Sequence, residues 1–129
     1  MLNCILDSLT AIYALATDPA DTAAATSGYI DVRGFEGQIG VVITNGTIGA
    51  GGSVTWTFLT ATDGSATGEV AITPVNGTPT VATPSNDPLT QIAVFDATQL
   101  KGFLKVVGTV ATDAGPLAYT IIGVKKYAS

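Results

Sequence analysis

The chain has 129 residues, a formal net charge of −5, one Cys and no His, and charged residues make up only 12% of it. This length fits a single domain, and a hydrophobic content of 47% excludes an intrinsically disordered chain. The absence of His and the single Cys exclude a His/Cys zinc site, a Ser–His–Asp triad and a disulfide within the chain. The five Lys and Arg residues form no dense run, which argues against binding of nucleic acid through its phosphates.

The first 16 residues carry apolar side chains at the three- and four-residue spacing of one helix face. We therefore expect a short N-terminal helix or an extended arm, packed either on its own domain or on a neighbouring subunit. Its apolar residues form the predicted subunit interface: Leu2, Ile5, Leu6, Leu9, Ile12 and Tyr13. We expect neither a secretory signal nor a membrane anchor, because no basic residue flanks the apolar residues and Asp7 interrupts them.

A spacer rich in Ala, Thr and Ser leads from this arm to a series of short β-type segments. We therefore divide the chain into an arm and spacer over residues 1–27 and a β-sandwich domain over residues 28–129. Turn residues separate the expected strands, which span 29–32, 38–44, 53–60, 69–73, 78–83, 91–95, 103–111 and 117–125. Seven or eight short strands at this spacing predict an all-β fold, either an antiparallel β-sandwich or a jelly-roll-like barrel.

Turn signals and one alternating strand add detail to this fold. Asn45-Gly46 is a strong hairpin signal after the strand at 38–44, and the turn at 113–116 is expected to pair the last two strands. Four Pro residues between positions 74 and 88 place the middle of the chain in an edge or a loop. Alternation over residues 53–60 puts three large apolar side chains on one face. The predicted core consists of Val54, Trp56, Phe58, Ile92, Val94, Val107 and Ile121.

The polar residues form no recognisable catalytic or metal site. Most carboxylates of the β-region stand beside turn residues, where Asp makes local hydrogen bonds; they are Asp31, Glu36, Asp63, Glu69, Asp87 and Asp96. Residues 61–65 lack the alternating oxygen ligands of a calcium loop. The Asn-Gly-Thr sequences at Asn45 and Asn76 fit turns better than glycosylation sites. We expect no enzyme activity, no cofactor, no bound metal and no small-molecule substrate.

Two parts of the chain resemble small structural proteins of tailed bacteriophages. One is the sequence GYIDVRGFEG at residues 28–37, followed by the apolar run at 41–43. The other comprises residues 95–97, 100–110 and 124–127, which look like the closing strands of these proteins. Several members of this family are capsid cement or decoration proteins, and the family has no catalytic motif. The middle of the chain, residues 60–88, is less typical of it.

The resemblance implies a β-rich virion protein, commonly a homotrimer, that is assembled in the host cytoplasm. It would bind the outer surface of the major capsid protein lattice and clamp neighbouring capsomers, with neither nucleic acid nor membrane as a partner. Two other functions stay open. A head-fibre or receptor-binding module of a phage would cluster exposed aromatic or polar residues on loops. A secreted bacterial surface or pilin-like subunit would require cleavage of the N-terminal segment.

Overall fold

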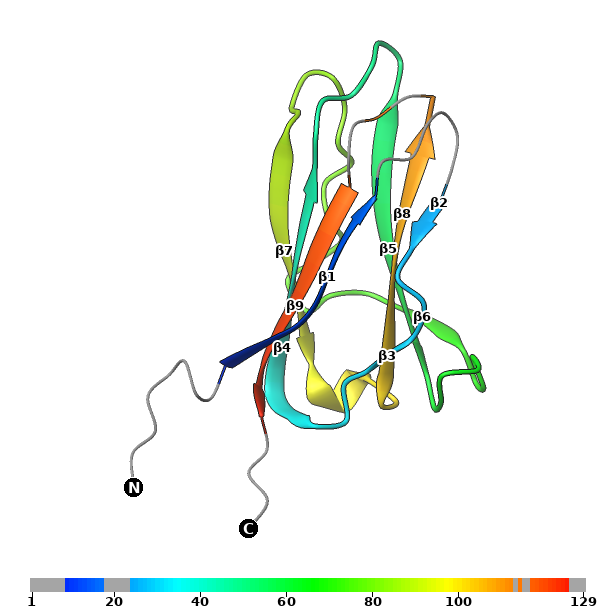
Figure 1. The fold of residues 1–129 in the computed structure, drawn as a ribbon, viewed down its shortest axis with the longest axis vertical. Coiled ribbons are helices and arrows are strands. Elements are labelled where there is room, and N and C mark those ends of the chain that lie inside the picture. The colour runs from blue at the N-terminus through cyan, green and yellow to red at the C-terminus, as the bar shows by residue number, and fades with distance from the viewer. Residues whose placement is uncertain (1–8, 18–23, 113, 115–116, 126–129) are drawn as a thin grey trace.

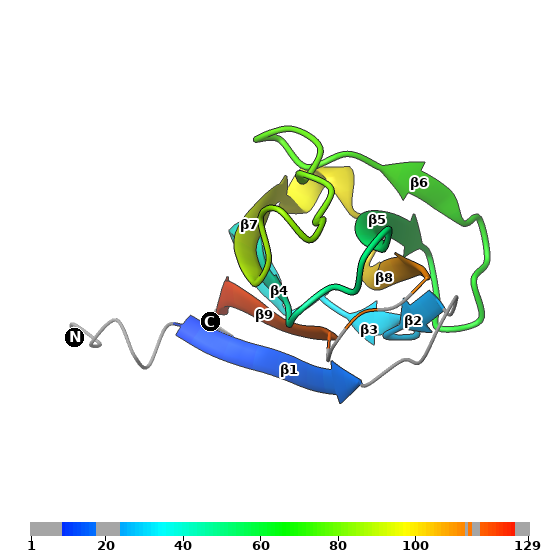
Figure 2. The same ribbon diagram turned by 90° about the horizontal axis from the view of Figure 1, so that it is seen from above.

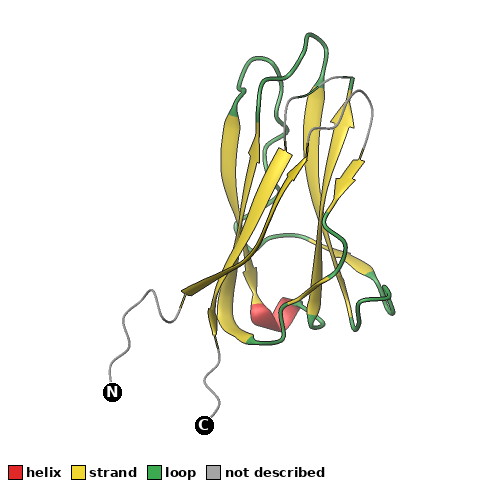
Figure 3. Ribbon diagram, viewed as in Figure 1, coloured by secondary structure: helices red, strands yellow, loops and turns green. Residues whose placement is uncertain are grey.

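Antiparallel strands dominate the computed structural model, which describes residues 9–17, 24–112, 114 and 117–125 (Figure 1). The strands are β1 (Leu9–Thr17), β2 (Ala24–Thr26), β3 (Ile30–Asp31), β4 (Phe35–Asn45), β5 (Ser53–Ala61), β6 (Val70–Ile72), β7 (Leu89–Asp96), β8 (Phe103–Ala111) and β9 (Leu117–Lys125). One short 3₁₀ helix, η1 (Ala97–Gln99), follows β7 (Figure 3). In the described part of the chain, no helix is long and apolar enough to cross a membrane.

The strands form two sheets that pack face to face. One sheet has the order β1-β9-β4-β7, and the other has the order β2-β8-β5-β6, with β3 also pairing with β8. The paired strands run antiparallel to one another. Seen from above, the two sheets enclose a common interior (Figure 2). The predicted all-β antiparallel sandwich is therefore confirmed.

The N-terminal region forms a strand, whereas the sequence left a short helix and an extended arm as two possibilities. Leu9–Thr17 form β1, which pairs with β9 along its length and has a bulge between Ala11 and Tyr13. The helix is therefore wrong for these residues, and the extended form is found. Pairing with β9 satisfies the backbone of β1, whereas an isolated helix of this length is marginal in water. β2 also pairs with the sandwich, through β8, so both strands before residue 28 belong to its sheets.

The chain crosses between the sheets at the two places where hairpins were predicted. β4 and β5 follow one another in sequence, yet β4 pairs with β7 and β9 while β5 pairs with β6 and β8. β8 and β9 likewise lie in opposite sheets. Both hairpin predictions are wrong, because the connections at 46–52 and 112–116 are long enough to cover the roughly 10 Å between packed sheets.

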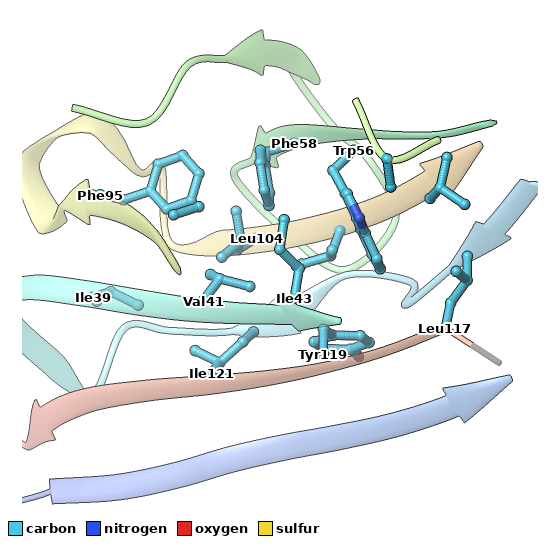
Figure 4. Close-up of a cluster of buried hydrophobic side chains, with 14 of the residues drawn as sticks. Ile39, Val41, Ile43, Trp56, Phe58, Phe95, Leu104, Leu117, Tyr119 and Ile121 are labelled. Carbon is cyan, nitrogen blue, oxygen red and sulfur yellow. The ribbon is translucent and has the colours of Figure 1, made fainter. Parts of the chain in front are cut away.

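The core lies between the sheets and consists of inward side chains from β4, β5, β7, β8 and β9 (Figure 4). Its largest fully buried apolar side chains are Phe58, Phe95, Ile39, Ile43, Leu104, Leu117 and Ile121. Phe58 and Phe95 come from opposite sheets and meet edge to face, with ring centroids 5.0 Å apart and an interplanar angle of 70°. Such a pair contributes about 0.5–1.5 kcal/mol beyond the area that it buries.

The predicted core is correct in β5 and β9 and wrong in β7 and β8. Burial confirms Val54, Trp56, Phe58 and Ile121. The prediction is wrong for Ile92, whose side chain is 58% exposed, because Ala93 and Phe95 point inward instead. The prediction is also wrong for Val94 and Val107, which alternate with the buried residues of β7 and β8 and are only partly buried. β7 carries apolar residues on both faces, and a shift of one residue exchanges the buried face of a strand for the exposed one.

The segment between β6 and β7 covers the free edge of β7. The Asn76 side chain accepts a hydrogen bond from the N–H of Val94 (2.9 Å) and donates one to the carbonyl of Ile92 (2.8 Å). The backbone N–H of Val75 donates to the carbonyl of Val94 (2.7 Å). Asn76 thus takes the place of a neighbouring strand, and the Pro-rich middle of the chain is an edge and loop region, as predicted.

The Trp56 ring provides the first test of this core. It packs on Gly108, where an added Cβ atom would lie 3.1 Å from Trp56 Cζ3 and 2.9 Å from Leu117 Cδ1. We expect Trp56→Ala to lower the free energy of unfolding by about 3–5 kcal/mol, because it leaves a cavity that the close-packed sheets cannot fill. Denaturant unfolding followed by far-UV circular dichroism measures this loss.

The control for this measurement is Thr57→Ala, because Thr57 neighbours Trp56 in β5 but is exposed. We expect it to change the free energy of unfolding by no more than about 0.5 kcal/mol. A loss below about 1 kcal/mol for Trp56→Ala would contradict the assignment of this ring to the core.

Candidate functional site

Charged residues gather at one end of the sandwich, where β4 and β8 begin and β5, β7 and β9 end (Figure 1). We term this the charged end. Its residues are Asp31, Arg33, Glu36, Asp63, Glu69, Asp96, Lys101, Lys105 and Lys125. Among the charged residues that the structure describes, Asp87 alone lies at the opposite end. The middle of the four-stranded sheet is therefore free of charge, whereas Lys105 and Glu69 lie on the outside of β8 in the other sheet.

In two turns, an Asp carboxylate accepts hydrogen bonds from backbone N–H groups. Asp63 accepts hydrogen bonds from the backbone N–H groups of Thr67 (3.1 Å) and Ser65 (2.8 Å). Hydrogen bonding by the Thr67 side chain, and then by these two N–H groups, lowers the pKa of Asp63. Asp96 accepts from the N–H of Thr98 (3.1 Å) at the start of η1. Residues 61–65 are thus a turn whose carboxylate is already satisfied. Across the described ranges, no group of three or more His, Cys, Asp or Glu residues could hold a metal ion.

Tyr29, Glu69 and Lys105 form a clamp across the outside of β8. The Tyr29 hydroxyl donates a hydrogen bond to the Glu69 carboxylate. Lys105 Nζ lies 3.6 Å from that carboxylate and 5.3 Å from the centroid of the Tyr29 ring. Partial burial, and then the hydrogen bond to Glu69 and its charge, raise the pKa of Tyr29 to about 12. The phenol therefore stays protonated at neutral pH and acts as a hydrogen-bond donor that ties distant segments together.

Arg33 and Asp31 form a second, exposed pair at the same end. Arg33 donates to both oxygens of Asp31, through Nε (2.9 Å) and NH2 (2.8 Å). Its guanidinium carbon lies 5.0 Å from the centroid of the Phe103 ring, in a cation–π arrangement. The side-chain hydrogen bonds from Arg33, and then its backbone N–H, hold the pKa of Asp31 at about 2. This carboxylate is an ion-pair partner and not a proton donor near neutral pH.

Two hollows in the surface are smaller than the roughly 300–1,000 Å³ of a small-molecule site. One, of about 230 Å³, lies beside the charged end and is lined partly by Phe35, Leu100, Arg33 and Lys101. Both of its cations already have partners, since Arg33 binds Asp31 and Lys101 Nζ donates to the carbonyl of Gly68 (2.9 Å). The other hollow, of about 240 Å³, is lined mainly by apolar residues, among them Trp56, Phe58, Ile72, Pro74 and Pro79.

The two Asn-Gly-Thr sequences have structural roles. The Asn45 side chain is 1% exposed and donates to the carbonyl of Gly46 (2.9 Å), so it is closed to glycosylation. Asn76 is exposed, but its amide is engaged by the edge of β7. The interpretation as a turn holds for Asn76, where the N–H of Gly77 donates to the carbonyl of Pro74 (3.0 Å). It does not hold for Asn45, which is the buried last residue of β4.

The predicted subunit interface falls partly on β1. This strand lies at the edge of its sheet, where Leu9 pairs in register with Val124, Tyr13 pairs with Ile121, and Ile12 lies at the bulge. Their contact with another subunit stays a prediction. The remaining interface residues, Leu2, Ile5 and Leu6, lie outside the described residues.

The sequence analysis missed an uncharged surface on the four-stranded sheet. Outward residues of β4, β7 and β9 form this surface, which we term the outer face: Gly40, Val42, Thr44, Thr90, Ile92, Val94, Ala118, Thr120 and Ile122. The signal for it was present in the consecutive apolar residues at 41–43 and 121–122. A strand with one solvated polar face alternates instead, so such runs indicate that both faces are apolar.

The Arg33–Asp31 pair gives a direct test of the electrostatics at the charged end. We expect Arg33→Ala to raise the pKa of Asp31 from about 2 toward its ordinary value of 3.8. The rise should be partial, because the backbone N–H of residue 33 still donates to Asp31 (3.0 Å). The stabilisation from this pair is present above pH 3.8 and is lost as the pH falls toward 2. NMR titration of the Asp31 carboxyl carbon measures the shift.

Lys101→Ala serves as the control, since Lys101 binds a backbone carbonyl and not Asp31. An Asp31 pKa that is unchanged in Arg33→Ala, or that moves equally in both variants, would contradict the assignment.

No family model and no curated protein matches the chain. The solved structures to which the chain is weakly similar include a chain of the Bacillus endospore appendages, a family of disulfide-linked pili. That match has 14% identity and a TM-score of 0.41, and it covers 92% of this chain and 90% of that one. The match to the VP2 subviral particle of infectious bursal disease virus has 13% identity and a TM-score of 0.43, and it covers 94% of this chain and 37% of that one. The match to the Gt strain of that virus has 11% identity and a TM-score of 0.41, and it covers 91% of this chain and 32% of that one. The chain spans about a third of the length of these two viral chains. Likenesses this weak carry no information about function.

Proposed function

We propose that this chain is a structural subunit of a virus particle, a capsid decoration or cement protein of a tailed bacteriophage. In this role it binds the outer surface of the major capsid protein lattice and stabilises the contacts between neighbouring capsomers. The resemblance of residues 28–37 and 100–110 to small phage structural proteins supports this proposal. These residues lie around β3, at the start of β4 and in β8, within the sandwich and its charged end.

The observation that carries the proposal is the separation of charge from the outer face of the four-stranded sheet. A subunit of a shell must bury wide surfaces against its neighbours, and an unpaired buried charge would cost several kcal/mol. Protein interfaces are accordingly depleted of charged residues at their centres. Here the charged end collects every described charged residue except Asp87, which leaves the outer face of the four-stranded sheet with Thr, Ala, Val, Ile and Gly and no charge.

The energetics of a repeated lattice suit a small rigid module. A specific contact needs about 1,000 Å² of buried surface in total, which a sandwich of this size can supply on one side. Many copies on one particle then act together, because each contact made by a multivalent assembly raises the effective concentration for the next. Such a role needs no catalytic group. Four carboxylates of the charged end are engaged in a turn, a helix cap and ion pairs: Asp63, Asp96, Asp31 and Glu69.

We assign the contact with the capsid to the predicted subunit interface. Leu9, Ile12 and Tyr13 lie in β1, at an edge of the sandwich. Leu2, Ile5 and Leu6 precede that edge strand in the sequence, where they can extend the same contact. An arm beside an edge strand lets a module hold a neighbouring subunit without disturbing its own core.

The first test compares particles with and without this protein. We expect particles that lack it to release their genome at a lower temperature, because fewer contacts hold the capsomers together. Purified full-length protein should bind to these particles and restore the release temperature, as measured with a dye that fluoresces on DNA. Immunogold labelling should place the protein on the head. A label on the tail, or an unchanged release temperature, would contradict the cement function.

The second test concerns the N-terminal contact. We expect the triple substitution Leu2→Ser, Ile5→Ser and Leu6→Ser to weaken binding to undecorated capsids by about tenfold or more, because three apolar side chains no longer become buried. Sedimentation of capsids with bound protein measures the affinity, and circular dichroism verifies that the variant is folded.

Asn3→Ala combined with Ser8→Ala provides a matched control, since these polar residues occupy the other side of the apolar pattern. Equal binding by the triple variant and by the wild type would refute the assignment of the capsid contact to this segment.

A further inference from the structure

The backbone groups of β5 point alternately to the two sides of the strand. In antiparallel strands the N–H and C=O of one residue point to the same side, and those of the next residue point to the other. Val54 exchanges both bonds with Ala82: its N–H donates to the Ala82 carbonyl (2.9 Å), and its carbonyl accepts from the Ala82 N–H (3.0 Å). Trp56 and Phe58, two and four residues further along β5, therefore direct their backbone groups to this same side, away from β8.

The pairing of β8 with the segment before β3 fixes the same alternation independently. The N–H of Ser27 donates to the carbonyl of Val106 (3.0 Å), and the hydroxyl of Ser27 accepts from the N–H of Val106 (2.9 Å). Val106 thus points away from β5, and its neighbour Val107, which pairs with Thr57, points toward β5. Thr57, and not Trp56, therefore bonds to β8.

On the side of β6, the neighbouring strand ends one pair short of Trp56. Phe58 pairs with Ile72, the last residue of β6. The same register would place Pro74 opposite Trp56, but Pro has no N–H and cannot donate to the Trp56 carbonyl. The pairing of β6 with β5 therefore stops at Phe58.

On the side of Ala82, the residue that would face Trp56 is bonded elsewhere. The register of Val54 with Ala82 places Thr80 opposite Trp56. The Thr80 N–H instead donates to Oε1 of Gln91 (2.7 Å), and the Thr80 carbonyl accepts from Nε2 of the same side chain (2.9 Å). Among the residues that the structure describes, none therefore donates to the Trp56 carbonyl or accepts from the Trp56 N–H.

The hollow of about 240 Å³ lies along this part of β5. Its lining comprises residues 56–58 of β5, residues 71–74 at and beyond the end of β6, and residues 78–79. We term it the Trp56 hollow. Trp56 and Phe58 are buried, and none of the nine lining residues is charged. Because backbone N–H and C=O groups away from bulk water require hydrogen-bond partners, this hollow favours a neutral group that both donates and accepts.

The molecule itself shows which group fits a single backbone pair of this kind. The carboxamide of Gln91 bonds to both the N–H and the C=O of Thr80, because its acceptor oxygen and donor nitrogen lie side by side. Asn76 uses its carboxamide in a related way, between the Val94 N–H and the Ile92 carbonyl. Side-chain carboxamides are thus the partners of unpaired backbone groups in this region of the sandwich.

Other ligands fit the Trp56 hollow less well. An added β-strand would have to pair on both sides of Trp56, where Val54 and Phe58 already have neighbours. The gap is therefore one residue long. A carboxylate has only acceptors and an ammonium group only donors, and the charge of either would meet no opposite charge in the lining. The volume suits one side chain and is below the roughly 300–1,000 Å³ of a drug-sized molecule.

We propose that the Trp56 hollow binds the primary carboxamide of an Asn or Gln side chain on a partner protein. The carboxamide oxygen accepts from the Trp56 N–H, the NH2 group donates to the Trp56 carbonyl, and the apolar stem packs against Pro74 and Pro79. This site does not depend on the cement function, because it follows from the register of β5 and the lining of the hollow.

Hydrogen exchange tests the unpaired backbone groups. We expect the Trp56 N–H of the full-length protein to exchange about tenfold or more faster than the N–H groups of Val54 and Phe58, because no strand neighbour holds it. Backbone-resolved NMR measures the three rates. Protection of Trp56 equal to that of Val54 and Phe58 would overturn the proposal.

Titration with butyramide tests the class of ligand. We expect a saturable shift of the Trp56 N–H signal in ¹H–¹⁵N correlation spectra, with a dissociation constant of about 1–20 mM, as is usual for a ligand of a few atoms. The matched control is 2-pentanone, in which a methyl group replaces the NH2 group. It should bind about tenfold or more weakly, because the Trp56 carbonyl then has no donor. Equal binding of the two compounds, or no saturable shift at Trp56, would contradict the assignment.

Two peptides test whether a side chain supplies the carboxamide. Acetyl-Gly-Gln-Gly methylamide and acetyl-Gly-Met-Gly methylamide share one backbone and differ only in the central side chain. We expect only the Gln peptide to shift the Trp56 signal. Equal shifts by both peptides would mean that their backbone binds, and the absence of a shift with the Gln peptide would mean that a side chain does not reach the site; either result refutes the proposal.

A pair of variants tests the location of the site. Thr78 is exposed and lines the hollow, so Thr78→Phe should fill it and weaken butyramide binding by about tenfold or more. Thr109→Phe is the matched control, since Thr109 is exposed in β8 and lies outside the lining. Circular dichroism verifies that both variants are folded. Unchanged binding in Thr78→Phe, or an equal loss in Thr109→Phe, would place the ligand elsewhere. The tests of the cement function use particles and the N-terminal segment, so either proposal can fail alone.

Discussion

The contact of Trp56 with Gly108 and Leu117 holds the two sheets together where β5, β8 and β9 meet. Trp56 and Gly108 face each other across β5 and β8, and Leu117 comes from the opposite sheet. A side chain at position 108 would collide with both partners. In the four-stranded sheet, Gly123 likewise leaves room for the Phe35 ring, with which a side chain at position 123 would collide. Close packing in this interior therefore depends on two strand positions that have no side chain, although Gly is otherwise unfavourable in a strand.

The sequence predicts burial and conformation correctly where a local pattern determines them. It does not where contacts with distant parts of the chain decide. The alternation in β5 identified Trp56 and Phe58 as core residues, because only a strand places them on one face. In β7 both faces are apolar, so the pattern could not decide between Ile92 and Phe95, and the structure buries Phe95 against Phe58 of the other sheet. The β1 strand shows the same limit. Its apolar spacing fits a helix, and only pairing with β9, more than a hundred residues away, decides its conformation.

The two edge strands of the four-stranded sheet, β7 and β1, have different surroundings. At β7, Asn76 uses its side-chain amide as an adjacent strand would use its backbone, and Val75 adds a backbone hydrogen bond. An edge that is occupied in this way cannot recruit another strand. At the opposite edge, β1 is nine residues long and contains no charged residue and no Pro. The sheet therefore directs any strand-to-strand contact away from β7 and toward the side on which the predicted subunit interface lies.

Charge placement keeps the outer face uncharged although the chain has a formal net charge of −5. Ile92 lies four residues before Asp96, the nearest described carboxylate along its strand, which corresponds to about 13 Å of extended chain. The Debye length at physiological ionic strength is about 8 Å, so the charged end acts only weakly at the centre of the outer face. The charged end is itself nearly balanced, because it holds five carboxylates and four Lys or Arg residues, and two ion pairs join residues of opposite sign there. Segregation thus lets residues of opposite charge pair with one another at one end of the sandwich, while the apolar area along the outer face stays free of charge.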